Sequence, residues 1–199
     1  MARTQIPQVR RKELLKAALK VMQRDGLHAA TIDKIAKEAG ASRGVVHHYF
    51  EDKDDLIEQT MRFVHAARGK AIAERLRSSQ SPSERLWSIV SVSLQKKFFR
   101  HDLCNVLISF NAKAFDKAGW SRLLKTIRKR ERSNLVHALR PLTSENDVSK
   151  LVLGIMSILE GCRLWAGYIP SFGSSRATAL VLAFLKQEVP SFDHRVASR

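Results

Sequence analysis

Four neighbouring residues combine side chains that suit contact with DNA. They are Arg43, Gly44, His47 and His48. On a helix they lie opposite Val46 and Phe50, which are four residues apart and point inward. Arginine can form two hydrogen bonds to guanine in the major groove, and a glycine lets the backbone approach closely. This face predicts a DNA-contacting helix, although an ordinary surface hairpin with a polar face shows the same pattern.

The segment Thr31–Lys53 has the pattern of two short helices joined by a tight turn. Its first apolar stripe has helical spacing and comprises Ile32, Ile35, Ala36 and Ala39. Thr31 precedes the stripe and can cap the helix, and Ser42 can cap the next one. Gly40 permits the left-handed turn between them. The segment is therefore predicted to be a helix-turn-helix.

Residues Thr31–Leu56 fit the pattern T-I-x-x-I-A-x-x-A-G-x-S-x-G-x-x-x-x-Y-F-x-x-K-x-x-L at every fixed position. This pattern resembles the N-terminal DNA-binding signature of the TetR family of bacterial regulators. The resemblance implies a homodimer, a variable helical ligand-binding domain, and repression that a small molecule relieves.

The same resemblance implies which residues contact DNA. Phosphate contacts would come from Thr31, Ser42, His47, His48, Tyr49 and Lys53. Base contacts would come from Arg43, Gly44 and Val45. The chemistry fits, because hydroxyl, imidazole and ammonium groups donate to phosphate oxygens and Val45 suits a thymine methyl group. The ring of Tyr49 also has an alternative role in the core.

The chain is strongly basic, with a formal net charge of +16 in 199 residues and an isoelectric point near 10.4. A polyanionic partner is the natural inference. The excess is greatest in residues 54–140, which hold 18 basic and 8 acidic residues, outside the predicted helix-turn-helix. A sequence-tolerant architectural DNA-binding protein is therefore an alternative function.

Helical periodicity continues along the chain and predicts an all-α fold of about nine helices. Beyond the helix-turn-helix, the predicted helices cover residues 8–25, 53–77, 83–99, 102–115, 120–139, 146–167 and 175–188. We expect a DNA-binding domain in residues 1–53 and a ligand-binding and dimerisation domain in residues 54–199. Residues 1–8 are expected to form a flexible arm, with Arg3, Arg10 and Arg11 available for phosphates. No run is expected to span a membrane, so a cytoplasmic location is predicted.

The last two predicted helices are strongly apolar. The resemblance implies that they pair with their copies in a four-helix dimer bundle; the alternative is that one subunit buries both. A two-fold symmetric operator, with half-site centres about 34 Å apart, also requires a second copy of the DNA-binding helix.

Motifs for catalysis are missing from the sequence, including GxSxG, HExxH and phosphate-binding glycine loops. His101, Asp102 and Cys104 are close in sequence, but we interpret this as a coincidence and predict no metal and no cofactor. A helical enzyme or structural dimer that retains a non-functional DNA-binding head is a third alternative.

Aromatic residues in the larger region are candidates to line a ligand pocket. They are Trp87, Phe98, Phe110, Phe115, Trp120, Trp165 and Tyr168. A cationic ligand would bind against aromatic faces with Glu160 as its counter-charge. The alternative is an aromatic core with an exposed or paired Glu160.

Within the family, the chain most resembles the betaine-operon (BetI-like) branch, whose regulators respond to choline. The similarity lies in GVVHHYFEDKDDLIEQTMR at 44–62, SNLVHALR at 133–140 and the Glu160–Gly161 step. The tryptophan that follows this step in the branch is replaced by Cys162–Arg163, and the one in the sixth helix by Phe110–Asn111. Arg163 would oppose a cation, so a quaternary ammonium such as choline is only one candidate inducer.

Overall fold

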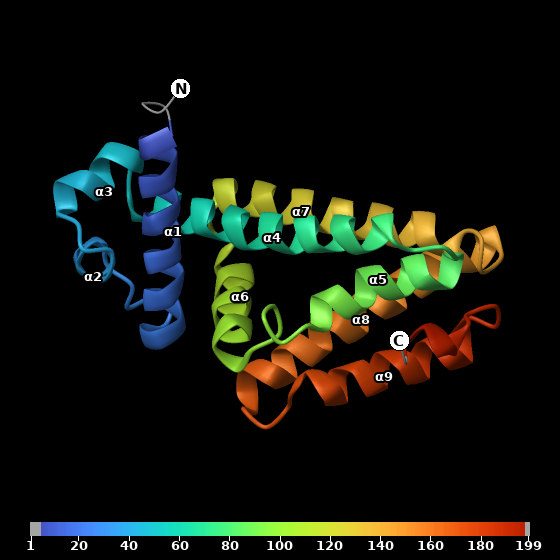
Figure 1. Cartoon of the computed structure of the whole chain (residues 1–199). Coiled ribbons are helices and arrows are strands. Elements are labelled where there is room, and N and C mark those ends of the chain that lie inside the picture. The colour runs from blue at the N-terminus through green and yellow to red at the C-terminus, as the bar shows by residue number, and fades with distance from the viewer. Residues whose placement is uncertain (1–4, 198–199) are drawn as a thin grey trace.

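The computed structural model describes residues 5–197, which form nine α-helices, one 3-10 helix and no strand (Figure 1). The helices are α1 (Gln5–Asp25), α2 (Ile32–Glu38), α3 (Arg43–Tyr49), α4 (Lys53–Arg77), α5 (Pro82–Leu94), α6 (His101–Lys113), α7 (Ala118–Leu139), α8 (Glu145–Tyr168), α9 (Ser174–Glu188) and the 3-10 helix η2 (His194–Ala197). The prediction of an all-α fold is confirmed.

Helices α1, α2 and α3 form one end of the molecule, and α3 lies on its outer side (Figure 1). The Oγ1 atom of Thr31 accepts a hydrogen bond from the Lys34 amide at 3.2 Å, and Ser42 Oγ accepts one from the Val45 amide at 3.3 Å. Gly40 has φ +56°, a conformation that glycine adopts without strain. Both predicted caps and the predicted glycine turn are confirmed.

The N-terminal arm differs from the prediction, because α1 already begins at Gln5. Arg3 lies outside the described residues. Arg10 donates to the carbonyl of Gly40 at 3.2 Å, and the Arg11 guanidinium lies 5.1 Å from the centre of the Phe50 ring. These two arginines therefore brace α1 against the helix-turn-helix and do not belong to a free arm.

Helix α5 is shorter than predicted and ends at Leu94, not near residue 99. Gln95 leaves the helical conformation with ψ 141°, and the following turn buries Phe99 while Phe98 stays half-buried beside Lys97. The apolar periodicity predicted too long a helix. Phe99, one of the last apolar residues of the pattern, is buried in the turn that follows α5 and does not belong to the helix.

Two buried clusters hold the fold together. The first joins α1, α2 and α3 to the start of α4, to α6 and to the first half of α7. The second joins α5, α8 and α9 to the end of α7. Since the first cluster includes residues on both sides of position 53, the domain boundary proposed there stays a prediction.

The start of α4 is fixed to the start of α7. Asp54 forms an ion pair with Lys117, and its carbonyl accepts a hydrogen bond from Trp120 Nε1 at 3.2 Å. From this junction α4 and α7 run side by side away from the helix-turn-helix (Figure 1). The two helices thus connect the helix-turn-helix to the rest of the molecule.

Helix α8 is long and apolar enough to cross a membrane by length and composition, contrary to the prediction that no such run exists. In the structure it packs against α6, α7 and α9. Its buried side, which includes Leu151, Val152 and Ile155, belongs to the second cluster. A buried helix of a soluble core meets the same criteria of length and composition.

Candidate DNA-binding surface and ligand region

The outer face of α3 is exposed as its pattern predicts. Val46 is completely buried and Phe50 is 2% exposed, so both fix the helix to the body. Arg43, His47 and His48 are exposed. The helix therefore presents a long cation and two imidazoles to the solvent at the end of the molecule.

Arg43 is held loosely in this conformation. Its guanidinium lies 3.7 Å from the Asp33 carboxylate and 3.4 Å from His47 Nε2, and both partners are exposed. Exposed ion pairs of this kind stabilise a protein little. Arg43 can therefore exchange these partners for a base edge at low cost.

Gly44 has no role within the chain that requires glycine. A Cβ atom added there would meet only Ser42 Oγ, at 3.8 Å, and the backbone φ is not positive. The open space lies on the exposed side of α3, next to Arg43. A small residue here suits close approach by an outside molecule, as the base-contact prediction requires.

The predicted phosphate-contacting residues surround this face. Thr31 and Ser42 accept cap hydrogen bonds through their oxygens, which leaves each hydroxyl hydrogen free to donate. Tyr49 is half-buried and its ring meets that of His48 edge-on, with centres 5.0 Å apart. Val45, predicted to contact bases, is half-buried and packs partly against the first cluster.

Lys53 lies at the first position of α4, whose N-cap is Asp52. Its Nζ atom donates to the carbonyl of His28 at 2.9 Å, so the side chain is tethered beside the helix-turn-helix. Partial burial lowers the pKa of Lys53. Two of the three ammonium hydrogens remain for a phosphate.

The aromatic candidates for a ligand pocket do not converge. Trp120 stacks on Phe110 with ring centres 4.8 Å apart inside the first cluster, and Trp87 belongs to the second. Phe115, Trp165 and Tyr168 are exposed by 87%, 55% and 72%. Phe98 lies in the turn after α5. Core packing and surface exposure separate these residues, so the prediction of one aromatic pocket is wrong.

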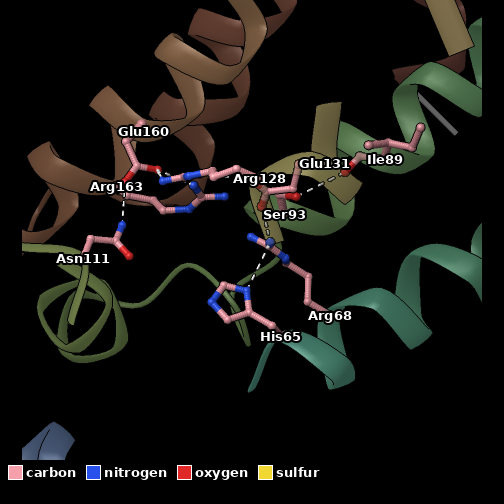
Figure 2. A network of polar contacts seen from close by, with 9 residues as sticks. All are labelled: His65, Arg68, Ile89, Ser93, Asn111, Arg128, Glu131, Glu160 and Arg163. Carbon is pink, nitrogen blue, oxygen red and sulfur yellow. Dashed lines mark hydrogen bonds and ion pairs between the residues drawn. The ribbon is translucent and has the colours of Figure 1, made fainter. Parts of the chain in front are cut away.

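Glu160 is already paired, which corrects its predicted role as counter-charge for a cationic ligand. Its Oε2 atom lies 2.7 Å from Arg163 and 2.9 Å from Arg128, and its Oε1 atom accepts from Asn111 at 3.0 Å (Figure 2). Burial opposes ionisation, but the two arginines outweigh it and lower the pKa of Glu160. Two cations already neutralise this carboxylate.

The same network continues to α4, for which we predicted no ligand-binding residue. Arg68 is 8% exposed and forms an ion pair with Glu131, which also lies 3.0 Å from Arg128 (Figure 2). Burial by itself would raise the pKa of Glu131, but the surrounding arginines lower it to about 2. Arg68 also approaches His65 Nδ1 at 3.3 Å.

A cleft of about 460 Å³ opens between α4 and α7 beside this network. Its charged and imidazole groups belong to Arg62, His65, Arg68, Arg130 and Glu131. Ile72, Leu123 and Ile127 provide an apolar wall. The volume is within the usual range for small-molecule sites. A signal for this site was present in the sequence, since Arg68 falls on the inward side of α4, which is otherwise mainly apolar, with His65 three residues before it.

His101, Asp102 and Cys104, which are close in sequence, have different surroundings in the structure. His101 Nδ1 pairs with the carbonyl of Ala166 at 2.8 Å, and Asp102 pairs with Arg100. Cys104 is buried, and this burial raises the pKa of its thiol to about 11.

Two family models match the chain. Residues 14–60 match the one described as "Bacterial regulatory proteins, tetR family", and residues 82–190 match "BetI-type transcriptional repressor, C-terminal". The first match contains α2 and α3, and the second contains α5 to α9.

Curated relatives and solved structures agree with these matches. The HTH-type transcriptional regulator BetI of Brucella anthropi is 33% identical over 153 residues, which cover 77% of this chain and 79% of that protein. BetI of Vibrio parahaemolyticus is 27% identical over 199 residues, covering 98% and 100%.

Among solved structures, a TetR transcription regulator from Haloarcula marismortui has a TM-score of 0.81 at 18% identity and covers 92% of this chain and 97% of its own. A transcriptional regulator from Saccharomonospora viridis, crystallised with choline, has a TM-score of 0.80 at 17% identity, covering 89% and 95%. These structures show the same fold. Because the BetI-type model matches more than half of the chain and a BetI regulator shares a third of its residues over most of both lengths, the chain belongs to the TetR family of bacterial transcriptional regulators, in its BetI-type branch.

Proposed function

We propose that this regulator is a sequence-specific repressor that binds a two-fold symmetric operator as a homodimer and leaves it when a small molecule binds. The regulators of this family are not enzymes, and they bind DNA operators and small-molecule ligands. We place the activity in the cytoplasm, where a repressor meets the chromosome. The single observation that carries the proposal is that the outer face of α3 is exposed while Val46 and Phe50 are buried and hold the helix in place.

We assign the DNA contacts to two classes of side chain. Arg43, Gly44 and Val45 lie at the start of α3 and would meet base edges in the major groove. The phosphate contacts would come from Thr31, Ser42, His47, His48, Tyr49 and Lys53. Phosphate contacts position a protein on DNA, whereas base contacts select the sequence.

The dimer is supported by the surface of α8 and α9. Leu153, Leu164 and Tyr168 are exposed on one face of α8, and Leu180 is 51% exposed on α9. Ser157 and Gly161 continue the same face of α8 at helical spacing. Contiguous exposed apolar surface marks an interaction site, and a second copy of both helices would cover it as a four-helix bundle.

Release is supported by the cleft between α4 and α7. Both helices border the cleft, and both meet at the Asp54–Lys117 junction beside Lys53. A ligand that changes the spacing of α4 and α7 would therefore shift the DNA-binding end. A ligand can change an equilibrium only through its different affinity for the two states.

Choline is the ligand of the Saccharomonospora viridis regulator. The charges in this chain do not support a cation beside Glu160, because Glu160 is paired with two arginines. We therefore leave choline out of the proposal for this chain.

Selection of bound DNA from a random pool tests the proposed function. The expected result is a two-fold symmetric site whose half-site centres are one or more helical turns, about 34 Å each, apart. Recovery of unrelated sequences with equal affinity would contradict it and would favour the sequence-tolerant architectural protein suggested by the net charge of +16.

A further inference from the structure

We infer that the cleft between α4 and α7 binds an anionic, partly apolar ligand, whose carboxylate-like group competes with Glu131 for Arg68. This inference rests on the proposed function and names the chemical class of the ligand. It differs from the cationic ligand expected from the sequence.

The charge balance around the cleft favours an anion. Three arginines of the network, Arg68, Arg128 and Arg163, face two glutamates, Glu131 and Glu160. The network therefore carries one positive charge in excess. Each glutamate is shared by two arginines, so an entering anion would balance the excess charge in a partly buried site, where charges attract more strongly than in water.

Arg130 adds a second positive charge at the mouth of the cleft. It lines the cleft and is exposed, and it forms no ion pair with the residues that the structure describes. Arg62, also at the mouth, is held by Glu58 at 2.6 Å. Arg130 is thus available to a ligand without breaking an existing ion pair.

His65 supplies a hydrogen-bond donor that needs an acceptor. A guanidinium can only donate, so Arg68 donates to His65 Nδ1, and this places the proton of the neutral ring on Nε2. Nε2 is buried and has no hydrogen-bond partner in the part of the chain that the structure describes. Such groups are rare in folded proteins, and the oxygen of a carboxylate, sulfonate or phosphate would satisfy this one.

The Arg68–Glu131 pair separates the cleft from two small voids. Both residues border the cleft and also border voids of about 30 Å³ and 10 Å³ toward α8 and α6. Figure 2 shows Arg68 between His65 and Glu131, with Arg128 and Arg163 farther away beside Glu160. An anion that replaced Glu131 at Arg68 would therefore extend from the cleft toward Arg128 and Arg163.

The apolar side of the cleft fits the rest of such a ligand. Ile72, Leu123 and Ile127 lie along the wall, and the cleft volume of about 460 Å³ exceeds the needs of a small inorganic ion. A molecule with an apolar ring or chain and one acidic group matches both parts of the cleft.

Two fluorescent dyes with the same aromatic rings test the charge preference. These are 8-anilino-1-naphthalenesulfonate, which is anionic, and N-phenyl-1-naphthylamine, which lacks the sulfonate. Titration of the full-length protein is expected to show at least about tenfold tighter binding of the sulfonate, since a charged hydrogen bond contributes about that much. Equal affinities would overturn the inference, because the sulfonate would then contribute nothing to binding.

Three variants locate the anion. Arg130→Gln is expected to weaken sulfonate binding about five- to tenfold, whereas its matched control Arg132→Gln, an exposed arginine of α7 outside the cleft, changes it less than about twofold. Glu131→Gln is expected to tighten binding about fivefold, because it removes the competing carboxylate from Arg68. A purely structural role of the pair would make Glu131→Gln weaken binding.

Equal effects of Arg130→Gln and Arg132→Gln, or weaker binding by a folded Glu131→Gln protein, would overturn the inference. Thermal unfolding shows whether each variant is folded. If Glu131→Gln is not folded, the comparison of Arg130→Gln with Arg132→Gln tests the inference. The selected operator provides the separate control. Normal operator binding together with equal affinities for the two dyes rejects the anion site alone. Failure to select any operator rejects the proposed repressor.

Discussion

Glutamate at both Leu153 and Leu180 is expected to convert the dimer into a monomer and to weaken operator binding by at least about 100-fold. Both side chains lie on the exposed apolar surface of α8 and α9, where they are 67% and 51% exposed in one subunit. In a dimer, two pairs of like charges would lose water at this interface, which is unfavourable. A monomer binds each half-site separately and loses the gain from linking them.

Sedimentation and operator titration measure this result. The matched control is Lys186→Glu, which makes the same total charge change at an exposed position of α9 about 120° around the helix from Leu180. The control should remain dimeric and keep operator binding within about threefold, the modest change expected for a surface charge. A double variant that stays dimeric, or a monomer with undiminished operator affinity, would show that the dimer uses another surface.

Lowering the pH from 7 to 4 is expected to cost the folded protein about 3 kcal/mol through His65 alone. Burial, with the nearby charge of Arg68, lowers the pKa of His65 from its ordinary 6.5 to about 3. The unfolded chain therefore takes up a proton at His65 before the folded protein does. This stability is fully present above pH 6.5 and is lost as the pH falls toward 3.

Glu131 acts in the same direction at lower pH. Its pKa is about 2 in the folded protein and 4.5 ordinarily, so the stability it contributes is lost as the pH falls from about 4.5 toward 2. Between pH 7 and 5, the proton that His65 takes up in the unfolded chain is therefore the main contribution of the network to the pH dependence of stability.

Urea unfolding at a fixed protein concentration, at pH 7, 5.5 and 4, measures the effect. The matched variant is His65→Gln, which keeps an acceptor for Arg68 but does not titrate. It should lose less stability than the natural protein between pH 7 and 4, by most of the 3 kcal/mol expected for His65. Parallel stability curves for the two proteins would show that His65 is protonated at similar pH in the folded and unfolded states.

Local features of this fold could be predicted because they depend on neighbouring residues. The caps at Thr31 and Ser42, the left-handed turn at Gly40 and the inward placement of Val46 and Phe50 each involve groups within four residues of one another. Helical spacing and cap chemistry determine such features directly. The dense pattern of the helix-turn-helix also identified the family.

The ligand region could not be predicted in the same way, because it depends on contacts between distant residues. Arg68 meets Glu131, which is 63 positions away, and Asn111 meets Glu160. The sequence alone does not distinguish an aromatic residue of a pocket from one of the core or the surface. Trp120 and Trp165 were therefore both predicted to line a pocket, although Trp120 is buried in the core and Trp165 is exposed. Arg68 and Arg128 could not be assigned to the network from the sequence, because charged residues on helices usually face water.

The most direct test of the central claim compares Arg43→Ala with Lys53→Ala on the selected operator and on scrambled DNA over a series of salt concentrations. If the exposed face of α3 determines the sequence, Arg43→Ala should cost about 1–3 kcal/mol on the operator, relax the preference at one base pair and change binding to scrambled DNA little. Lys53→Ala should weaken both DNAs alike and reduce the salt slope by about one. Equal losses on both DNAs for both variants would contradict the account, because α3 would then contribute charge alone and no sequence selection.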